Sequence, residues 1–417
     1  MMAVHGAALV KSIVDDLAGG TTSIVVVPQN VDPSAVEQAV EFYVYQQSSY
    51  HDFRKLFLPD WTSGSPVMFF SEAFSVDWGS RVAPRTVDNL VRTDGLPEMI
   101  LASAFTELPE DKKKQWLDFV MEVDSAVTRA RVQYPAFCVV AYAGDQGLQV
   151  LVPTPSLKVR PWYNLFTLTR VEAELQGILS RQDSAERTWQ AALVASLAGS
   201  DNEVADCLSP AVIRSRDEIF KQLNRIADEK GFSVHDLERA GIEQFVYGHS
   251  YQPLERMRPE DAIYRLWNLG LMDYTAEYGW EVVSWALMPL GLTWIVDHRI
   301  WRAQIKLVMP LVDQVRLSVV SYLCGYGGRS WLVDEVNNLV ASSTFGSRTI
   351  KSCWAAEFSE LIAILDNPAY CTTRAVELLQ ALRLAYSIRN ELAHYRPIEP
   401  IDYFELLQRV RALGFGP

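Results

Sequence analysis

Three residues that could act together on a phosphodiester lie close to one another near the C-terminus. Arg389, Asn390 and His394 belong to the segment Arg389-Asn390-Glu391-Leu392-Ala393-His394. Because a helix turns once every ~3.6 residues, Asn390 and His394 should lie one turn apart on the same face, with Arg389 roughly 100° around from Asn390. A cation, an amide and a titratable imidazole would then meet at the last turn of a helix. Such a set could hold a phosphate group and move a proton beside it.

These residues resemble the signature of HEPN-domain proteins, an Arg that is often followed by Asn, with a His four to six residues after the Arg. Many members of that family are RNases of toxin and antiviral-defence systems. The resemblance implies a metal-independent site in which His394 is the general acid or base on the 2′-hydroxyl or the leaving oxygen. It also implies that Arg389 stabilises charge on the phosphorane and that Asn390 orients His394 or the phosphate. Family members usually form this site across a two-fold dimer.

A second interpretation of the same segment involves no chemistry. Cationic side chains in the last turn of a helix satisfy exposed carbonyl groups and the helix dipole, which contributes about 0.3–1 kcal/mol. Arg389 and His394 fit that structural role. Asn390 does not, because it is a poor helix former that neither packing nor capping requires there. Both interpretations stay open at the level of the sequence.

The C-terminal region, 298–417, should position the segment in a helical bundle. Apolar periodicity predicts five helices, over 299–322, 330–341, 351–365, 372–394 and 403–413. Pro397 and Pro400 separate the last two. A bundle of four or five helices with one polar site is the architecture that this pattern favours. HEPN domains resemble it, since their Arg-Asn and His lie late in the penultimate helix.

A second candidate set lies on the first helix of this bundle. Arg299, Arg302 and Lys306 repeat at i, i+3 and i+7, which is the spacing of one helix face. Such a basic face could contact the backbone of RNA. A solvated helix face is the more common cause of the pattern.

The N-terminal region, 1–155, should form an α/β domain. Short apolar runs predict buried strands at 23–27, 67–70, 99–102, 137–141 and 150–152, and helices are expected between them at 33–46, 85–91 and 110–134. Strands alternating with helices favour a parallel sheet. The order of strand, loop, helix and further strands resembles a P-loop NTPase core of the AAA+ or STAND kind.

The loop after the first strand nevertheless lacks what a P-loop needs. That family requires Gly-x4-Gly-Lys-Ser/Thr, because bare amides must surround a phosphate and Lys must reach it. Here Pro28–Ser34 has no glycine and no lysine, and Asp32 would repel a phosphate. The strand over 99–102 does not end in the Asp that would hold Mg²⁺, and Glu107 lies too far along the chain. The resemblance implies a degenerate domain without ATP hydrolysis and without a cofactor; an unrelated α/β domain is the alternative.

The middle region, 156–297, is expected to be mostly helical. Capping-box spacing at 183–186 precedes one helix, and 212–230 shows helix periodicity. Another helix should start at Pro259 and end at Gly270, before a strand over 281–286. Helix, helix and strand in this order resemble a winged-helix module, although no base-reading motif accompanies them.

Composition limits the remaining possibilities. The 417 residues are 49% hydrophobic and carry a net charge of −13, so a broad DNA-binding surface is not expected. Cysteines are odd in number, without a Cys-x-x-Cys, and the histidines lack metal-ligand spacing, so no metal site is predicted. The N-terminus lacks the features of a signal peptide, and the apolar run over 285–296 is too short to span a bilayer. We expect a soluble, cytoplasmic protein with no membrane partner.

Together these features predict a multidomain α/β plus all-α protein of a bacterial conflict or phage-defence system. Its C-terminal HEPN-like bundle would cleave RNA, as a homodimer or in a complex with other defence proteins, and its degenerate NTPase-like domain would serve sensing or assembly. The alternative belongs to another class: a non-catalytic adaptor that assembles with an active ATPase or nuclease.

Overall fold

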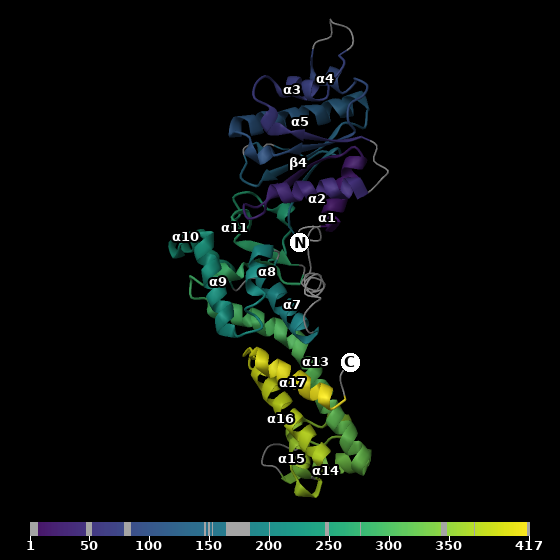
Figure 1. Ribbon diagram of the computed structural model, residues 1–417, viewed down its shortest axis with the longest axis vertical. Coiled ribbons are helices and arrows are strands. Elements are labelled where there is room, and N and C mark those ends of the chain that lie inside the picture. The colour runs from purple at the N-terminus through teal and green to yellow at the C-terminus, as the bar shows by residue number, and fades with distance from the viewer. Residues whose placement is uncertain are drawn as a thin grey trace. The chain divides into compact units, whose positions relative to one another are not determined.

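The computed structural model divides the chain into two compact units (Figure 1). The first unit comprises Met1–Thr167 and Glu238–Val283, and the second Leu168–Leu237 and Ser284–Pro417. The sequence predicts three consecutive regions, 1–155, 156–297 and 298–417. In the structure Glu238–Val283, from the expected middle region, belongs to the first unit. The structure describes residues 7–46, 52–78, 85–145, 147–148, 151, 153–163, 184–199, 201–246, 250–275, 277–342, 348–370 and 372–414.

A five-stranded sheet in the order β2-β3-β4-β1-β5 forms the centre of the first unit. Its strands are β1 Thr22–Val27, β2 Phe53–Phe57, β3 Met99–Ser103, β4 Ala136–Tyr142 and β5 Leu157–Pro161. All neighbouring strands are parallel. β1 and β3 are buried along their whole length, as strands covered on both faces should be. The parallel α/β sheet confirms the expected fold class and fits the P-loop-like resemblance.

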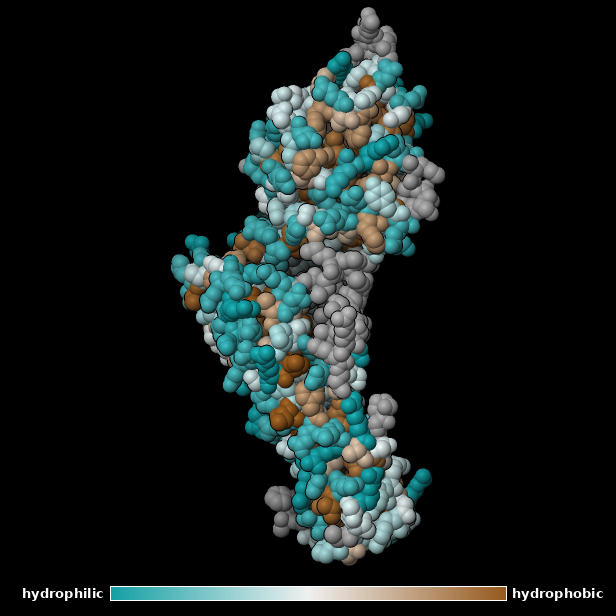
Figure 2. Space-filling view, in the orientation of Figure 1, coloured by the Kyte–Doolittle hydropathy of each residue, from teal (hydrophilic) through white to brown (hydrophobic). Residues whose placement is uncertain are grey.

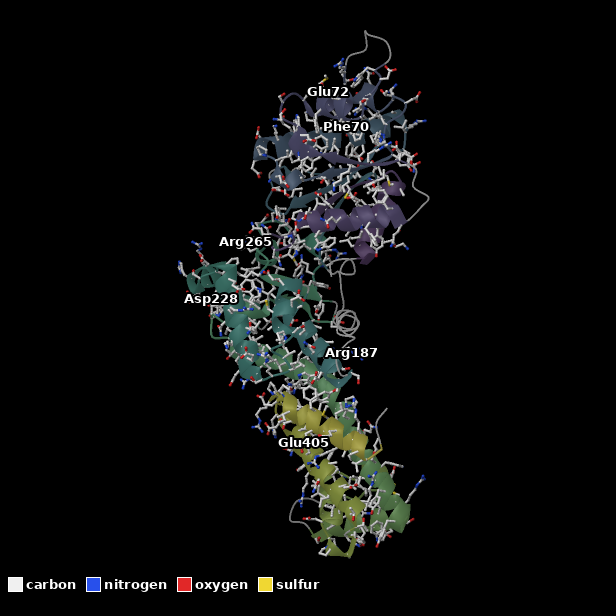
Figure 3. All side chains as sticks on the ribbon, in the orientation of Figure 1. Phe70, Glu72, Arg187, Asp228, Arg265 and Glu405 are labelled. Atoms are coloured by element: carbon white, nitrogen blue, oxygen red, sulfur yellow. The ribbon has the colours of Figure 1, made fainter. Side chains whose placement is uncertain are left out.

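Helices cover both faces of this sheet (Figure 1). On one face lie α1 Ala7–Ala18 and α2 Pro33–Gln46, whose Val10, Leu17 and Val40 pack with Val25 and Leu101 in one buried cluster. On the other face lie α3 Pro66–Ala73, α4 Val87–Leu90 and α5 Glu110–Ala130. There Phe70, labelled in Figure 3, contacts the rings of Phe119 and Phe137. Burial of these two apolar layers is what holds the sheet unit together.

The predicted strands are confirmed for the three inner strands of the sheet and not for its two edge strands. The runs at 23–27, 99–102 and 137–141 are β1, β3 and β4. The run at 67–70 is instead in helix α3, because Ser65 caps it by accepting from Met68 N and Pro66 occupies its first turn. The edge strands are β2 and β5, and neither was predicted, because β2 contains the exposed Arg54 and Lys55 and β5 contains Lys158 and Arg160. Of the run at 150–152, residues 150 and 152 lie outside the described residues.

The returning stretch of the first unit is a helix followed by a hairpin. It contains η4 Ile242–Phe245, η5 Leu254–Arg256, α11 Ala262–Asn268, β6 Met272–Thr275 and β7 Gly279–Val282, and the last residues of α10 Val234–Ala240 form its start. β6 and β7 pair antiparallel. The strand expected over 281–286 ends at Val282, and Ser284–Leu287 is the short helix α12. The winged-helix resemblance of the middle region stays a prediction.

This stretch bonds to the loop between β1 and α2. Gln29 N donates to Asn268 O at 2.9 Å. Gly270 has a φ of +72°, and a Cβ there would lie 2.6 Å from Cγ of Asn30. A glycine is therefore needed both for the backbone conformation and for the close approach.

The second unit is helical. Its elements are α7 Ser184–Ala198, α8 Asn202–Leu208, α9 Arg216–Lys230, α12, α13 Thr293–Gly327, α14 Arg329–Ser342, η6 Cys353–Ala355, α15 Phe358–Leu365, η7 Pro368–Tyr370, α16 Thr373–Ala393 and α17 Pro400–Ala412. The helical C-terminal region is thus confirmed, and each of the five predicted helices overlaps an observed one. The 183–186 capping box includes residue 183, which lies outside the described residues.

Helix α13 is the longest element, with 35 residues. By length and hydropathy it could cross a membrane, with 33% of the relevant window buried. It also buries Arg299, Arg302 and Gln304, and the Gln304 amide bonds both the N–H and the C=O of Ile398 at 2.8 Å. Polar groups held this way by other helices fit the core helix of a water-facing bundle. Figure 2 shows hydrophilic residues over much of the visible face of this unit, with apolar residues in separate spots.

We predict that Gly270→Ala destabilises the sheet unit by roughly 2–3 kcal/mol, the sum of left-handed strain and the clash with Asn30. Gly95→Ala is the matched control, since its φ is +84° and no described atom lies within 4 Å of a Cβ there. The control should lose only ~1 kcal/mol. Urea unfolding of the full chain measures both. Equal losses would show that the contact with Asn30 does not matter.

Candidate functional sites

Helix α16 carries the Arg-Asn-His segment and is well specified by its sequence. Thr372 caps its start by accepting from Ala375 N at 3.0 Å. Buried residues recur at helical spacing along one side, namely Leu378, Leu382, Ala385, Ile388 and Leu392. This stripe packs the helix into the bundle and leaves the residues between to face outward.

The structure brings Arg389 and Asn390 together at the end of this helix. Arg389 Nη1 donates to Asn390 Oδ1 at 3.2 Å, so the guanidinium bends toward the face that Asn390 shares with His394. Arg389 and His394 are exposed and Asn390 is half-buried. The N–H of His394, the residue that caps the end of the helix, donates to Asn390 O and Glu391 O. All three predicted residues are therefore accessible to a ligand within one and a half turns.

The chain leaves α16 through a Schellman motif with an unusual residue. Arg396 N donates to Glu391 O at 3.0 Å and Tyr395 N to Leu392 O at 3.2 Å. Tyr395 has a φ of +59°, in the position where glycine is usual. The strain of a non-glycine residue there is about 1–2 kcal/mol. The Arg396 guanidinium also pairs with both carboxylate oxygens of Glu391, at 2.6 and 2.9 Å, which balances the nearest acidic charge.

Aromatic rings of α13 support this helix end. Trp301 Nε1 donates to Leu392 O at 2.6 Å, so a carbonyl of the last turn is satisfied. The Trp301 ring contacts the ring of Tyr395 at 4.7 Å between centroids and that of His298 at 5.2 Å. The local sequence around the motif gave no sign of this support; the one available signal was a His and a Trp three residues apart on an apolar helix.

The second predicted set does not form one exposed basic face. Arg299 and Arg302 are buried, with exposures of 6% and 8%, whereas Lys306 is exposed. Arg299 Nη1 donates to Ser284 Oγ at 2.7 Å. The i, i+3, i+7 spacing predicts one shared face, but Arg299 and Arg302 are covered by other parts of the unit and Lys306 is not. Contact of these residues with RNA stays a prediction that the geometry does not favour.

In the sheet unit, the chain itself bonds the groups of the β1–α2 loop. Besides the bond from Gln29 N to Asn268 O, Val31 N donates to Pro28 O at 3.1 Å. Ser34 N donates to Asp32 Oδ1 at 2.9 Å, and Ser34 Oγ to Asp32 Oδ2 at 2.8 Å. The Asp32 carboxylate thus accepts from the first turn of α2, where a phosphate would sit in a P-loop protein. These amides are already committed to partners within the chain.

A buried carboxylate stands at the end of β3. Glu37 on α2, 4% exposed, accepts from Ser103 Oγ at 2.6 Å and from Ala104 N at 2.9 Å. Burial raises the pKa of Glu37 above its usual 4.5, although the two hydrogen bonds and Lys55 oppose the rise. Glu37 therefore ties α2 to the sheet at the place where a P-loop protein holds Mg²⁺. Glu107, in the short helix η2 Phe105–Glu107, is not part of this contact, although its charge also raises the pKa of Glu37.

A buried ion pair braces the neighbouring strand end. Lys113 on α5 donates to Asp145 Oδ1 and to Glu110 Oε1, both at 2.7 Å. Burial alone would lower the pKa of Lys113, but the two carboxylates outweigh it and raise the pKa. Asp145 also accepts from Tyr142 N at 2.8 Å, so the turn after β4 is fixed to the first turns of α5. Removing either charged partner would leave the other buried and uncompensated.

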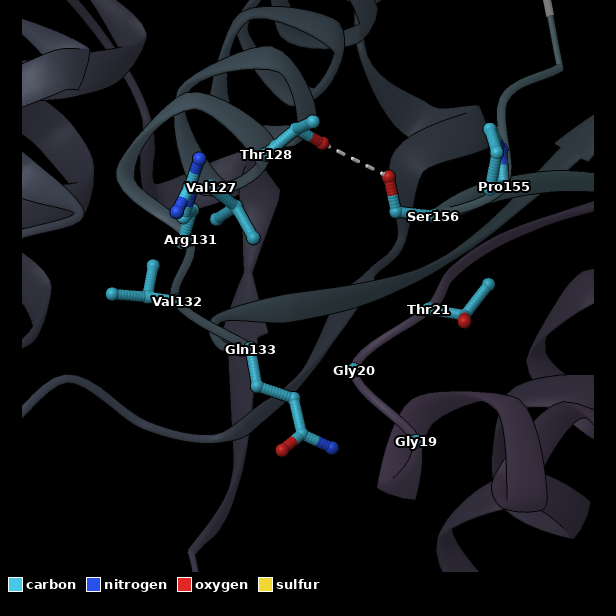
Figure 4. Close-up of a pocket in the computed structure, with 10 residues that line it drawn as sticks. All are labelled: Gly19, Gly20, Thr21, Val127, Thr128, Arg131, Val132, Gln133, Pro155 and Ser156. Atoms are coloured by element: carbon cyan, nitrogen blue, oxygen red, sulfur yellow. Dashed lines mark hydrogen bonds between the residues drawn. The ribbon is translucent and has the colours of Figure 1, made fainter.

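An open pocket of about 490 Å³ lies at the amino ends of the strands, opposite the end of the sheet that carries Glu37 and the β1–α2 loop (Figure 4). Its lining residues precede β1, β4 and β5 or end α5, and they include Gly20, Thr128, Arg131, Gln133 and Ser156. Open α/β sheets bind ligands at the carboxyl ends of their strands, so this is not where the fold would hold a nucleotide. Within the described residues, no group of three His, Cys, Asp or Glu side chains could hold a metal ion.

Comparison with known proteins does not establish a family for this chain. No protein-family model matches it, and no curated protein sequence matches it. Among solved structures, the Aeropyrum pernix ORC1 protein in complex with DNA matches at 15% identity, with a TM-score of 0.32, over 70% of this chain and 92% of that chain. A likeness this low carries no argument, and the fold rests on the strand order described above.

We predict that Glu37→Gln removes a pH-dependent part of the stability of the sheet unit. Because the folded pKa of Glu37 is raised, its contribution is fully present below 4.5 and is lost as pH rises through the folded pKa. The variant should therefore gain stability over the parent as pH rises, by an amount of order 1 kcal/mol. The melting temperatures of the parent and the variant, measured from pH 4.5 upward, test this difference in stability.

Glu41→Gln is the matched control, since Glu41 lies on the same helix but pairs with Lys55 at the surface. It should change stability by less than ~1 kcal/mol. A parent and a Glu37→Gln variant with parallel pH profiles would contradict the assignment of a raised pKa to Glu37.

Proposed function

We propose that the helical unit carries a HEPN-type, metal-independent ribonuclease site and acts as an effector or subunit of a bacterial conflict or phage-defence system. The observation that supports this most is the position of Arg389, Asn390 and His394 within one and a half turns of one helix end, with the Arg389 guanidinium bonded to the Asn390 amide and with Arg389 and His394 exposed. A purely terminating role would leave Asn390 without a reason to be there.

In the proposed reaction the RNA 2′-oxygen bonds to the phosphorus while the bond from phosphorus to the 5′-oxygen breaks. His394 takes the proton from the 2′-hydroxyl or supplies one to the leaving oxygen. Arg389 stabilises the negative charge that grows on the non-bridging oxygens, and Asn390 holds the guanidinium or the phosphate in position. One imidazole cannot do both proton transfers at once, so a second copy of the site would complete it. This favours a homodimer or a complex with a related bundle.

The sheet unit would serve sensing or assembly rather than hydrolysis of ATP. Support comes from the committed amides of the β1–α2 loop and from Glu37, whose carboxylate occupies the end of β3. A bound triphosphate would have to displace Asp32 and break the bond between Gln29 and Asn268. Both changes cost free energy that no lysine in the loop offsets.

A non-catalytic adaptor is the second candidate. It is favoured by the same occupied loop, because amides that already have partners within the chain leave the sheet unit without an open phosphate site. The two candidates differ in one direct observation. An effector cleaves labelled tRNA or total RNA in EDTA, and an adaptor does not.

We predict that ATP neither is hydrolysed by the protein nor stabilises it. A nucleotide present at 100 times its Kd would raise the free energy of unfolding by ~2.7 kcal/mol. Differential scanning fluorimetry with millimolar ATP and Mg²⁺ should therefore give an unchanged melting temperature. A clear, concentration-dependent rise would rule out the occupied-loop argument.

We predict that Arg389→Ala and His394→Ala each lower RNA cleavage by about 10²–10⁴-fold while the fold is kept. Loss of a charged side chain from an exposed final turn should cost no more than ~1 kcal/mol. Cleavage rate and melting temperature, measured on the same preparations, separate the two effects.

Arg383→Ala is the matched control for Arg389→Ala. Arg383 lies on α16 too and pairs with Asp366 at the surface, at 2.9 Å. Its loss should leave cleavage within about twofold of the parent, since an exposed ion pair contributes at most ~1 kcal/mol to stability and nothing to the site. Absence of cleavage in the parent itself, in EDTA or with divalent metals, would leave the adaptor as the better description.

A further inference from the structure

Three aromatic rings run in a row beside the Arg389–His394 site. His298 and Trp301 lie one turn apart on α13, and Trp301 also contacts Tyr395, the residue directly after His394. We name this row the aromatic ladder. His298 and Tyr395 are exposed and Trp301, between them, is half-buried. The ladder therefore has a fixed centre and two ends in contact with solvent.

We infer that the aromatic ladder is a stacking site for one unpaired base of single-stranded RNA, with Tyr395 as its outer ring. The inference rests on the proposed function, because it supplies the base-binding part of the same site. Tyr395 follows His394 directly in the chain, so the ring and the imidazole belong to the same end of α16. Aromatic side chains that stack bases are the common means of holding single-stranded RNA without reading its sequence.

The conformation of Tyr395 is the first argument for a role of its ring. A tyrosine with a φ of +59° is strained where glycine would not be, and yet its ring is 66% exposed. Burial of an exposed ring does not explain the residue, and the Schellman motif does not require a side chain there. Backbone strain kept at a position of this kind points to a use for the side chain.

Rigidity and charge are the second argument. The Trp301 indole is fixed by its bond to Leu392 O, so Tyr395 packs on a ring that is already held in place. Preorganised rings lose less entropy when a base stacks on them. The neighbouring Arg389 is exposed, and Glu391 is paired with Arg396, so a phosphate beside the stacked base would meet the Arg389 guanidinium. An apolar protein segment would have no need of this cation, which favours RNA as the occupant.

Tyr395→Gly is the decisive variant, because it removes the ring and relieves the backbone strain together. It should be no less stable than the parent toward thermal unfolding, yet bind a labelled single-stranded oligoribonucleotide about tenfold more weakly. Binding is measured by fluorescence anisotropy in a His394→Ala background, in which cleavage should be about 10²–10⁴-fold slower. Tyr395→Phe keeps the ring and should bind as the parent does. Tyr326→Ala removes another exposed tyrosine of the same unit, 58% exposed, and should have no effect.

A second probe tests the kind of contact. An oligomer of the same length with abasic positions should bind weakly to the parent and equally weakly to Tyr395→Gly, since it offers phosphates without bases. Equal binding of the base-containing oligomer by the parent and Tyr395→Gly would overturn the inference while RNA cleavage, measured in the parent, could still stand. If Tyr395→Gly loses binding but the parent never cleaves RNA, the stacking inference stands and the proposed ribonuclease function is contradicted. A parent that binds no single-stranded RNA, or that binds a peptide partner through Tyr395 instead, overturns the inference as well.

Discussion

Polar backbone groups removed from water must find partners, and this requirement determines the arrangement of both units. In the helical unit, Trp301 satisfies the carbonyl of Leu392 and Gln304 bonds both main-chain groups of Ile398. These bonds fix the end of α16 and the start of α17 to α13. In the sheet unit, Asn268 O and the Asp32 carboxylate satisfy amides after β1. In the helical unit these bonds leave the end of α16 accessible. In the sheet unit they use the amides of the β1–α2 loop, so that loop has no free site.

At the carboxyl ends of β1 and β3, polar groups of the chain occupy the positions that a phosphate and a metal ion hold in a P-loop protein. A P-loop gains its affinity from amides that have no partner until a phosphate arrives. Here Asp32 supplies a permanent anion, and Ser103 donates to Glu37 where a metal ligand would be needed. Each bond is stabilising for the empty domain. The amides and carboxylates at the carboxyl ends of β1 and β3 are therefore used within the fold itself.

The local parts of this structure could be predicted from the sequence, and the non-local parts could not. Central strands such as β1 and β3 are continuous apolar runs, and the Arg-Asn-His spacing on α16 follows from helix geometry alone. The strand β2 was missed because an edge strand has polar residues at exposed positions. Arg299 and Arg302 were assigned to solvent because periodicity identifies a helix face without saying what covers it. Likewise, nothing near Gln29 in the sequence indicates that its partner is Asn268.

An RNA site on a chain with a net charge of −13 has to work through short-range contacts. At physiological ionic strength charges separated by more than about 8 Å are largely screened, so the acidic surface elsewhere weakens RNA binding only modestly. It also gives no long-range attraction, and affinity from release of many counterions is not available. Stacking does not depend on net charge, and each stacked base contributes about 1–3 kcal/mol. A rigid ring beside a guanidinium group is therefore the kind of site that an acidic protein can use, and the aromatic ladder next to Arg389 has this composition.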